Sequence, residues 1–180
     1  MRVISGSSRG RKLSPITGDR MRPTSDRIRE DIFNIIGNRI RHARVLDIFA
    51  GTGALGIEAL SRGAEEAVFI DLDCALIHNN IRLCRFEDRA FIFNIDIIRF
   101  SFPQIITSQK FDFIFLDPPY GQGYIEKVLH KEKFLELMAP DALLIAEHGL
   151  KENLQIHVPG LDIFRQKKYS NTIISFSRIT

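Results

Sequence analysis

The tetrapeptide Asp-Pro-Pro-Tyr at residues 117–120 directly follows an apolar run, Phe111–Leu116. Such a run predicts a buried strand, and ligands of open α/β sheets bind beyond the carboxyl ends of their strands. Because the prolines have no N–H and little freedom, Asp117 and the Pro118 carbonyl can accept hydrogen bonds from an NH₂ group. Tyr120 offers a face on which a base can stack. The motif predicts a catalytic site of Asp117, Pro118 and Tyr120 that acts on a planar amine. The alternative is a rigid turn with a half-buried tyrosine.

A glycine-rich turn, Gly-Thr-Gly-Ala-Leu-Gly at residues 51–56, follows a second apolar run and matches the pattern G-x-G-x-x-G. Gly51 and Gly53 let the backbone approach a ligand, and Gly56 lets a helix pack closely on a strand. Asp71 ends the next predicted strand, where an acid can accept both ribose hydroxyls of a nucleotide. The turn predicts a nucleotide-like cofactor, with a ligand-free β–α turn as the alternative. Together with the amine site, it indicates group transfer to the exocyclic nitrogen of a base.

Two acidic residues favour S-adenosylmethionine over a dinucleotide as the cofactor. Asp47 precedes the glycines, where a carboxylate can face the cationic amino acid end of that cofactor but would repel a diphosphate. Asp96 follows the third predicted strand and can reach the adenine amino group, or it can cap a helix that begins at Ile97. The predicted cofactor-binding residues are Asp47, Phe49, Ala50, Gly51, Gly53, Asp71 and Asp96.

Short apolar runs alternate with helical patterns from residue 45 onward. The predicted strands are Val45–Phe49, Ala67–Asp71, Ala90–Ile95, Phe111–Leu116 and Ala142–Glu147. The predicted helices between them are Ala54–Ser61, which is stopped by Gly63, Ala75–Cys84, a weaker Ile97–Ile106, and Tyr124–Met138. This alternation is typical of βαβ units on a parallel sheet.

The end of the chain departs from this pattern. Asp162–Tyr169 and Thr172–Arg178 are strand-like runs separated only by Ser170 and Asn171, which predicts a hairpin that adds an antiparallel strand to the sheet edge. The predicted fold class is therefore α/β and Rossmann-like, with a seven-stranded, mostly parallel sheet whose last strand is antiparallel.

The first 44 residues are expected to form a β-hairpin and a helix. Residues 2–13 read as a hairpin around residues 7–10, and Thr24 or Ser25 can cap the helix that follows. Gly37 is expected to end that helix. Its predicted apolar face consists of Ile28, Ile32, Ile35 and Ile36.

Positive charge is concentrated in this N-terminal segment. Residues 1–44 hold eleven Lys/Arg against four Asp/Glu, for +7, whereas the remainder holds fourteen against eighteen, for −4. This asymmetry predicts a localised contact with a polyanion, and a merely solvated basic arm is the alternative. Asp26 and Glu30 could instead pair with the helix arginines, Arg29 included. The predicted RNA-binding residues are Arg9, Arg11, Lys12, Arg22 and Arg27.

Length and composition narrow the class of protein. A chain of 180 residues predicts a single domain, with residues 1–44 as a basic extension and 45–180 as the core. Its apolar runs fall short of the roughly 20 residues that cross a bilayer, and the N-terminus lacks a signal-peptide core. We therefore expect a cytoplasmic protein. Cys74 and Cys84 have no CxxC partner and the histidines show no ligand spacing, so no metal site is expected.

Four stretches give the chain a resemblance to a known family: Arg2–Leu13, Arg22–Glu30, Leu46–Gly63 and the tetrapeptide at residues 117–120. The sequence resembles the RsmD family of bacterial 16S ribosomal RNA guanine-N2 methyltransferases over nearly its whole length. The first two stretches are more specific than the glycine motif. Asp71 stands where relatives often have Glu, which preserves the ribose role. The region after residue 150 resembles the family only weakly.

The resemblance implies a class I methyltransferase fold with S-adenosylmethionine as cofactor. It also implies methylation of N2 of one guanine in 16S ribosomal RNA, with a partly assembled small subunit as substrate and a monomeric enzyme. Three other functions stay open from the residues. They are a DNA adenine-N6 methyltransferase, which also uses Asp-Pro-Pro-Tyr, a dinucleotide-dependent reductase, and a non-catalytic ribosome assembly factor. The chain is too short to include a separate domain that reads a DNA target. No catalytic Tyr/Lys or His pair of a reductase can be identified. The intact tetrapeptide argues against a non-catalytic factor.

Overall fold

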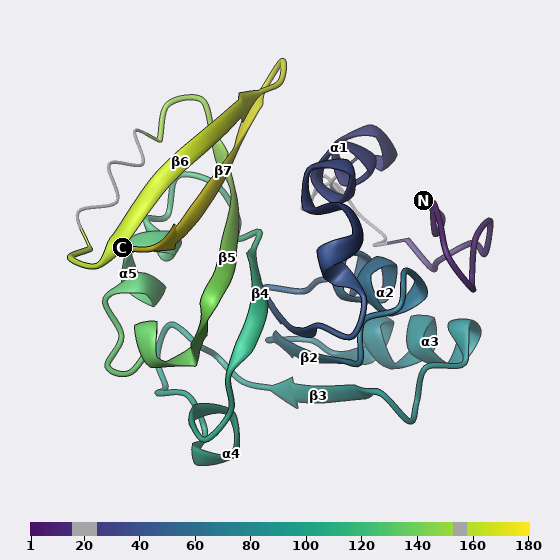
Figure 1. Ribbon diagram of the computed structural model, residues 1–180. Coiled ribbons are helices and arrows are strands. Elements are labelled where there is room, and N and C mark those ends of the chain that lie inside the picture. Colours follow the sequence, from purple (N-terminus) through teal and green to yellow (C-terminus); the bar gives the residue numbers. More distant parts are fainter. Residues whose placement is uncertain (16–24, 153–157) are drawn as a thin grey trace. The chain divides into compact units, whose positions relative to one another are not determined.

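A computed structural model describes residues 1–15, 25–152 and 158–180 of the chain (Figure 1). These residues form two compact units, Met1–Asn94 and Ile95–Thr180. Arg22 and Thr24, which were predicted to contact RNA and to cap a helix, lie outside the described residues.

Three parallel strands form the centre of the first unit. They are β1 (Arg44–Ile48), β2 (Glu66–Asp71) and β3 (Ala90–Asn94), with β2 paired to both of the others. Helices α2 (Ala54–Ser61) and α3 (Ala75–Cys84) connect them in the predicted order. Every residue of α2 is buried, which explains why its residues are small or apolar apart from Glu58. The alternation of strand and helix predicted from residue 45 is thus confirmed in this unit.

The N-terminal elements of the first unit differ in detail from the prediction. The expected hairpin is a loop closed by one antiparallel bridge between Arg2 and Lys12. Helix α1 (Asp26–Ile36) is capped by Ser25, whose hydroxyl accepts from the N–H of Ile28, and ends at Gly37, where the 3₁₀ turn η1 (Gly37–Ile40) begins. The predicted apolar face was partly wrong: the buried residues of α1 are Arg29, Ile32, Phe33 and Ile36.

Four strands form the sheet of the second unit. Strands β4 (Phe111–Leu116) and β5 (Met138–Gly149) are parallel. Strand β7 (Thr172–Ile179) is antiparallel to β5 and to β6 (Leu161–Lys168), which lies at the sheet edge. The terminal hairpin is confirmed. With seven mostly parallel strands, an antiparallel last strand and intervening helices, the predicted fold class is confirmed as well.

Two predicted helices of the second unit were too long. The helix predicted over Ile97–Ile106 is reduced to α4 (Gln104–Thr107), because Pro103 interrupts a helix that runs through it and instead forms the N-cap of α4. The helix predicted over Tyr124–Met138 ends as α5 (Tyr124–Leu129), and only a 3₁₀ turn η2 (Leu135–Leu137) follows. Lys133 has a φ of 66° in the loop between them, which is incompatible with a continuous helix. No helix among the described residues is long and apolar enough to cross a bilayer.

Candidate active site

The backbone at the end of β1 turns sharply before α2. Phe49, Gly51 and Gly53 all have positive φ, at 62°, 56° and 77°, and the N–H of Gly53 donates to the carbonyl of Ala50 at 2.7 Å. Phe49 is the exceptional member, because the left-handed region costs a non-glycine residue ~1–2 kcal/mol. Strain of this kind concentrates at ligand sites. The geometry fits the cofactor roles predicted for Phe49, Ala50, Gly51 and Gly53, which stay predictions.

Gly56 allows α2 to pack tightly on β2. A Cβ atom at this position would lie 2.3 Å from Cε1 of Phe69 and 3.2 Å from Oδ2 of Asp47. The third glycine of the motif therefore has the packing role predicted for it, and no larger residue fits.

Asp71 at the end of β2 joins the glycine-rich turn directly. Its Oδ2 accepts from the N–H of Gly51 at 2.7 Å, and its Oδ1 accepts from the N–H of Asp73 at 3.1 Å. The residue is only partly buried. A carboxylate has about four acceptor positions, so capacity remains for the hydroxyls of a ribose. The structure thus brings together Asp71 and Gly51 of the glycine-rich turn, both of which were predicted from the sequence, and the arrangement fits a nucleoside.

Asp47 lies beneath the same turn and is 1% exposed. Its Oδ2 accepts from the N–H of Gly56 at 2.9 Å, at the start of α2. Burial, and secondarily the charge of Asp71, raise the pKa of Asp47 to about 7, although the Gly56 hydrogen bond opposes the shift. Asp47 therefore holds the turn against the helix, and its predicted contact with the cofactor stays a prediction.

Asn80 was not selected from the sequence, yet it supports the cofactor turn. It is fully buried on α3, donates from Nδ2 to the carbonyl of Thr52 at 2.9 Å, and accepts at Oδ1 from the N–H of Ser14 at 2.7 Å. The available signal was a polar residue on the apolar stripe that Ile77 and Ile81 define along α3. Asn80 fixes the middle of the glycine-rich turn to the helix behind it.

Asp96 has the capping role that was one of its two predicted alternatives. Its Oδ1 accepts from the N–H groups of Ile98 and Arg99 at 3.0 and 3.2 Å, and its Oδ2 lies 3.3 Å from Nε of Arg99. The capped segment is a single turn rather than the predicted helix. Its contact with adenine stays a prediction.

The Asp-Pro-Pro-Tyr turn follows β4 directly, as predicted. Asp117 is partly buried, Pro118 is buried, and Pro119 and Tyr120 are exposed. Tyr120, with 44% of its surface exposed, presents an aromatic face. The catalytic roles predicted for Asp117, Pro118 and Tyr120 stay predictions.

The hydroxyl of Tyr120 is anchored to the neighbouring strands. It donates to Oε1 of Glu147 on β5 at 2.6 Å and lies 3.0 Å from Oγ1 of Thr172 on β7. The Thr172 hydroxyl in turn donates to the carbonyl of His148 at 2.7 Å. Burial and then the Glu147 hydrogen bond raise the pKa of Tyr120, so the phenol stays protonated. Only the ring of Tyr120 is therefore presented, and its orientation is set by β5 and β7.

A second carboxylate holds the other side of the same turn. Oε1 of Glu152 accepts from the N–H of Gly121 at 2.6 Å, and its Oε2 accepts from the N–H of Gly149 at 2.7 Å. Glu152 thereby ties the residue after Tyr120 to the end of β5. Neither Glu152 nor Thr172 was selected from the sequence, because the contacts span 31 and 52 residues.

The N-terminal loop is packed against α2 rather than solvated. Oε2 and Oε1 of Glu58, which is 1% exposed, accept from the N–H groups of Ile4 and Ser5 at 2.7 and 3.0 Å. The Ser61 hydroxyl accepts from the N–H of Ser8 and donates to the carbonyl of Ser5. The backbone of the loop is therefore held in place, whereas the choice between RNA contact and solvation of its basic side chains stays open.

The predicted RNA-binding residues fall into different environments. Arg9, Arg11, Lys12 and Arg27 are exposed, although Arg11 also donates to the carbonyl of Leu83. Arg29 is fully buried and donates to Asp26 Oδ1 at 2.8 Å and to the Arg2 carbonyl at 2.6 Å. Arg29 thus holds the segment in place, as the pairing alternative proposed. RNA contact by the exposed residues stays a prediction.

The cysteines are ordinary buried thiols. Cys74 and Cys84 are free, and burial raises the pKa of Cys74 to about 11, so that this thiol is protonated. Within the described ranges, no group of three or more His, Cys, Asp or Glu residues is arranged to hold a metal ion.

Comparison with known proteins covers almost the whole chain. Residues 1–178 match the family described as Conserved hypothetical protein 95. The chain is 37% identical to YlbH of Bacillus subtilis, with 96% of this chain and 95% of the relative covered. It is 31% identical to Ribosomal RNA small subunit methyltransferase D of Escherichia coli, with 93% and 84% covered.

Solved structures agree with these relatives. The protein yhhF of Escherichia coli superimposes with a TM-score of 0.85 at 31% identity, with 99% of this chain and 97% of the other covered. A ribosomal protein L11 methylase of Lactobacillus delbrueckii, at 13% identity and a TM-score of 0.60, covers 85% of this chain and 79% of its own and shows a likeness of fold alone. The chain therefore belongs to the Conserved hypothetical protein 95 family, the RsmD family that its motifs resemble.

Proposed function

We propose that this protein is an S-adenosylmethionine-dependent methyltransferase that modifies the exocyclic N2 of one guanine in 16S ribosomal RNA. Its relatives named Ribosomal RNA small subunit methyltransferase D support the substrate class. The observation that carries the chemistry is the Asp-Pro-Pro-Tyr turn at the end of β4, held by Glu147, Thr172 and Glu152.

The glycine-rich turn fits the cofactor for two structural reasons. Its left-handed residues bring backbone rather than side chains to the end of β1, and the partly exposed Asp71 carboxylate retains acceptor positions for ribose hydroxyls. Asp47 and Asp96 are the further predicted contacts, to the amino acid end and to the adenine. When bound, S-adenosylmethionine supplies an electrophilic methyl group on a sulfonium.

The Asp117 carboxylate and the Pro118 carbonyl would orient the amine. The guanine N2 lone pair is shared with the ring, so that this nitrogen is a weak nucleophile. Two acceptors for its N–H groups direct the lone pair and stabilise the positive charge that develops on the nitrogen as the new N–C bond forms. The surplus proton leaves to Asp117 or to water. Tyr120 would stack on the base, for which ~1–3 kcal/mol per base is typical.

The natural substrate is proposed to be a partly assembled small subunit rather than bare RNA. The exposed Arg9, Arg11, Lys12 and Arg27, together with Arg22, would bind the RNA backbone through phosphates. The proposal includes a monomeric enzyme that works in the cytoplasm. The alternative function that uses the same Asp-Pro-Pro-Tyr turn is a DNA adenine-N6 methyltransferase. The methylated nucleoside distinguishes the two functions.

The decisive experiment combines Asp117→Ala with analysis of the product nucleoside. Asp117→Ala should lower turnover on small subunits by ~10²-fold or more, a typical contribution of one positioned polar group, and should leave cofactor affinity unchanged. Glu132→Ala, at an exposed site, is the matched control and should retain full activity.

Mass spectrometry of the modified RNA identifies the base. N2-methylguanosine supports the proposal, whereas N6-methyladenosine would mean that the base is wrong. A fully active Asp117→Ala enzyme would show that the turn is scaffold and that the amine is held elsewhere.

A further inference from the structure

We propose that the β6–β7 hairpin carries a second RNA contact surface on one of its faces, made of Phe164, Arg165, Lys167 and Arg178. We call it the basic–aromatic surface. The inference rests on the proposed function, because it assigns this surface to the same ribosomal RNA substrate. It concerns the part of the chain in which the family resemblance is weakest.

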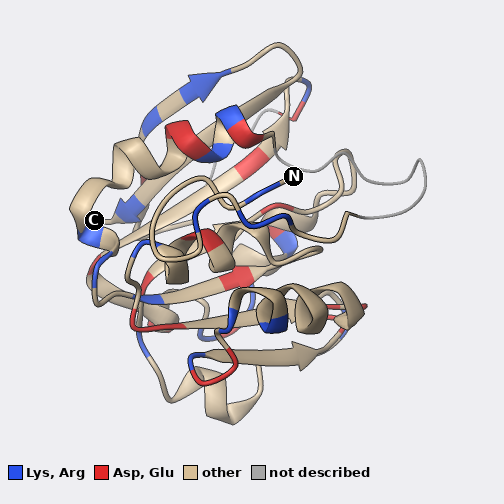
Figure 2. Ribbon diagram, turned by 90° about the vertical axis from the view of Figure 1, so that its right-hand side faces the viewer, with Lys and Arg blue, Asp and Glu red and all other residues tan. Residues whose placement is uncertain are grey.

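Charge is unevenly distributed within the second unit. Residues 95–157 carry six Lys/Arg against nine Asp/Glu, whereas residues 158–180 carry four against one. Figure 2 shows the blue segments of this hairpin near the arrowheads of both strands. A local basic patch on an otherwise acidic unit attracts a polyanion without making the whole unit basic.

The two arginines of this surface form no ion pair within the described ranges. Among the residues that the structure describes, no carboxylate forms an ion pair with Arg165 or Arg178, although Asp162 lies opposite Arg178 on the neighbouring strand. By contrast, Arg44 and Arg62 of the first unit pair with Glu66 and Glu58 at 2.5 and 2.6 Å. The two guanidinium groups therefore remain available for phosphates, which a guanidinium suits particularly well.

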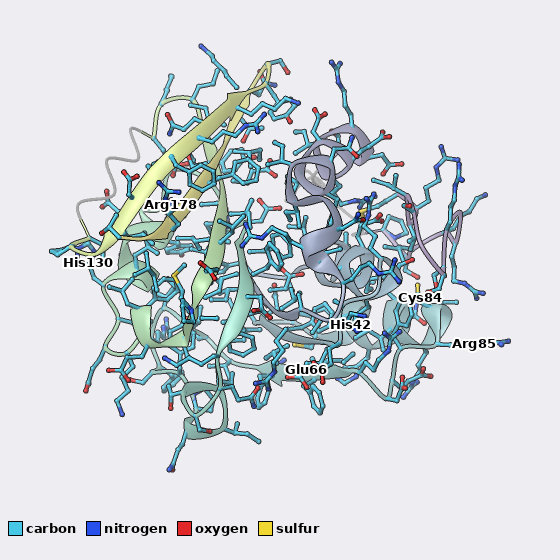
Figure 3. All side chains as sticks on the ribbon, viewed as in Figure 1. His42, Glu66, Cys84, Arg85, His130 and Arg178 are labelled. Atoms are coloured by element: carbon cyan, nitrogen blue, oxygen red, sulfur yellow. The ribbon has the colours of Figure 1, made fainter. Side chains whose placement is uncertain are left out.

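The surface also contains an exposed aromatic ring. Phe164 is 42% exposed and sits where the β6–β7 register shifts, between Ile163 and Arg165. The Arg178 guanidinium lies 5.4 Å from the centre of the Phe164 ring, and Figure 3 labels Arg178 on this hairpin. An aromatic face flanked by arginines is the arrangement that binds an unstacked base and its phosphates.

The hairpin is connected to the proposed amine site within the same unit. Thr172, the first residue of β7, lies 3.0 Å from the Tyr120 hydroxyl, and Lys167 of the surface pairs with Ile174, two residues further along β7. At ~3.3 Å per residue, Arg178 lies ~20 Å along β7 from Thr172. An RNA strand that delivers a base to Tyr120 can therefore continue along the basic–aromatic surface.

Protection of an edge strand is the competing explanation. Lysines and a register shift on an edge strand such as β6 discourage pairing with another sheet. This explanation accounts for Lys167 and Lys168. It does not account for Arg178, which lies on the inner strand β7, or for an exposed Phe164, which would favour association.

The test compares the double variant Arg165→Gln/Arg178→Gln with the control Lys127→Gln/Lys133→Gln, which removes the same charge from exposed positions around α5. Binding to purified, protein-free 16S ribosomal RNA is measured over a range of salt concentrations. The hairpin variant should lower the slope of log affinity against log salt by ~1.4–1.8, and the control should not. Phe164→Leu, which keeps an apolar contact with Phe176, should weaken binding by ~5- to 150-fold.

Several results would overturn the inference. One is an unchanged salt slope in the folded hairpin variant, and another is an equal loss in the control. Loss of binding only to protein-containing small subunits would assign the hairpin to a protein partner instead. If the unmodified protein failed to methylate partly assembled small subunits, the proposed function would fail, and this result is distinct from a hairpin variant whose salt slope matches that of the control. Thermal unfolding by circular dichroism establishes that each variant is folded.

Discussion

Asp71 shows how a single carboxylate can organise a site from two directions. It accepts from Gly51, on the turn that it faces, and from Asp73, on its own chain segment. The residue is also partly exposed, and two hydrogen bonds do not exhaust the acceptor capacity of a carboxylate. The first prediction follows from this double role.

Asp71→Ala should weaken S-adenosylmethionine binding by ~10- to 100-fold, which corresponds to the loss of one hydrogen bond to a charged acceptor at ~1.5–3 kcal/mol. Asp71→Asn keeps an acceptor for Gly51 and should lose less. Isothermal titration calorimetry measures both, with the exposed Asp88→Ala as control. Unchanged affinity in Asp71→Ala would remove this residue from the site.

The raised pKa of Asp47 predicts that the stability of the protein depends on pH. Its folded-state pKa of about 7 lies above the usual 3.8, so the folded protein binds a proton that the unfolded chain has already released between these values. This contribution to stability is complete below about pH 4 and is lost as the pH rises through about 7. It amounts to a few kcal/mol, since each unit of pKa difference corresponds to ~1.4 kcal/mol.

Asp47→Asn cannot ionise but keeps an oxygen for the Gly56 N–H. Its free energy of unfolding should therefore fall less between pH 5 and pH 8 than that of the unmodified protein. Urea denaturation at each pH gives the two curves, and Asp88→Asn serves as the exposed control. Parallel curves would show that Asp47 is already ionised in the folded protein.

At the scale of elements, two strands position a turn that belongs to a third. Strands β5 and β7 supply Glu147 and Thr172 to the Tyr120 hydroxyl, and Glu152 beyond β5 binds the turn through Gly121. The turn after β4 therefore depends on the antiparallel part of the sheet for its orientation.

Tyr120→Phe should lower turnover by ~10-fold or more, because it removes the hydrogen bond to Glu147 that orients the ring, and a hydrogen bond to a charged group contributes ~1.5–3 kcal/mol. Glu147→Gln preserves an acceptor and should lose less. Cofactor affinity should be unchanged in both, which separates positioning from general unfolding. Full activity of Tyr120→Phe would mean that only the ring matters.

The contact between the N-terminal loop and α2 leads to a prediction about packing. A Cβ at Gly6 would lie 1.8 Å from the Ser61 carbonyl oxygen, whereas a Cβ at Gly10 meets nothing within 4 Å. Both glycines have positive φ, at 85° and 80°. Gly6→Ala should therefore destabilise the protein by ~1–3 kcal/mol more than Gly10→Ala, as overpacking typically does. Urea denaturation measures both, and equal losses would show that the loop can move away from α2.

At the scale of the whole molecule, basic residues serve two purposes. Arg29 is buried and structural, whereas Arg9 and Lys12 project from the packed N-terminal loop into solvent. Deleting the loop would remove the N–H groups that donate to Glu58, so an effect on folding could not be separated from an effect on RNA affinity. Point substitutions are the cleaner test.

Arg9→Gln/Lys12→Gln should lower the salt slope of RNA binding by ~0.7–0.9 for each lost phosphate contact. Cofactor affinity should not change. Arg39→Gln/Arg41→Gln removes the same charge from exposed positions outside the loop and should have no such effect. The same slope in the loop variant and the unmodified protein would show that these two residues do not touch the RNA.

The sequence by itself determined the elements whose signals are local. Strand Phe111–Leu116 and helices Ala54–Ser61 and Ala75–Cys84 have the predicted bounds, because apolar periodicity and flanking glycines act within a few residues. The Ser25 cap and the glycine-rich turn are local in the same sense. Where a local signal was overlooked, as at Pro103, the predicted helix was wrong.

Only the tertiary structure decided which polar groups meet and which lose water. The pKa of Asp47 depends on how much protein surrounds its carboxylate, and the burial of Arg29 depends on the loop that closes over it. The contact between Tyr120 and Thr172 spans 52 residues. Desolvation and long-range hydrogen bonds are properties of the assembled chain, so residue types and spacings could name the candidate site but not the groups that hold it in place.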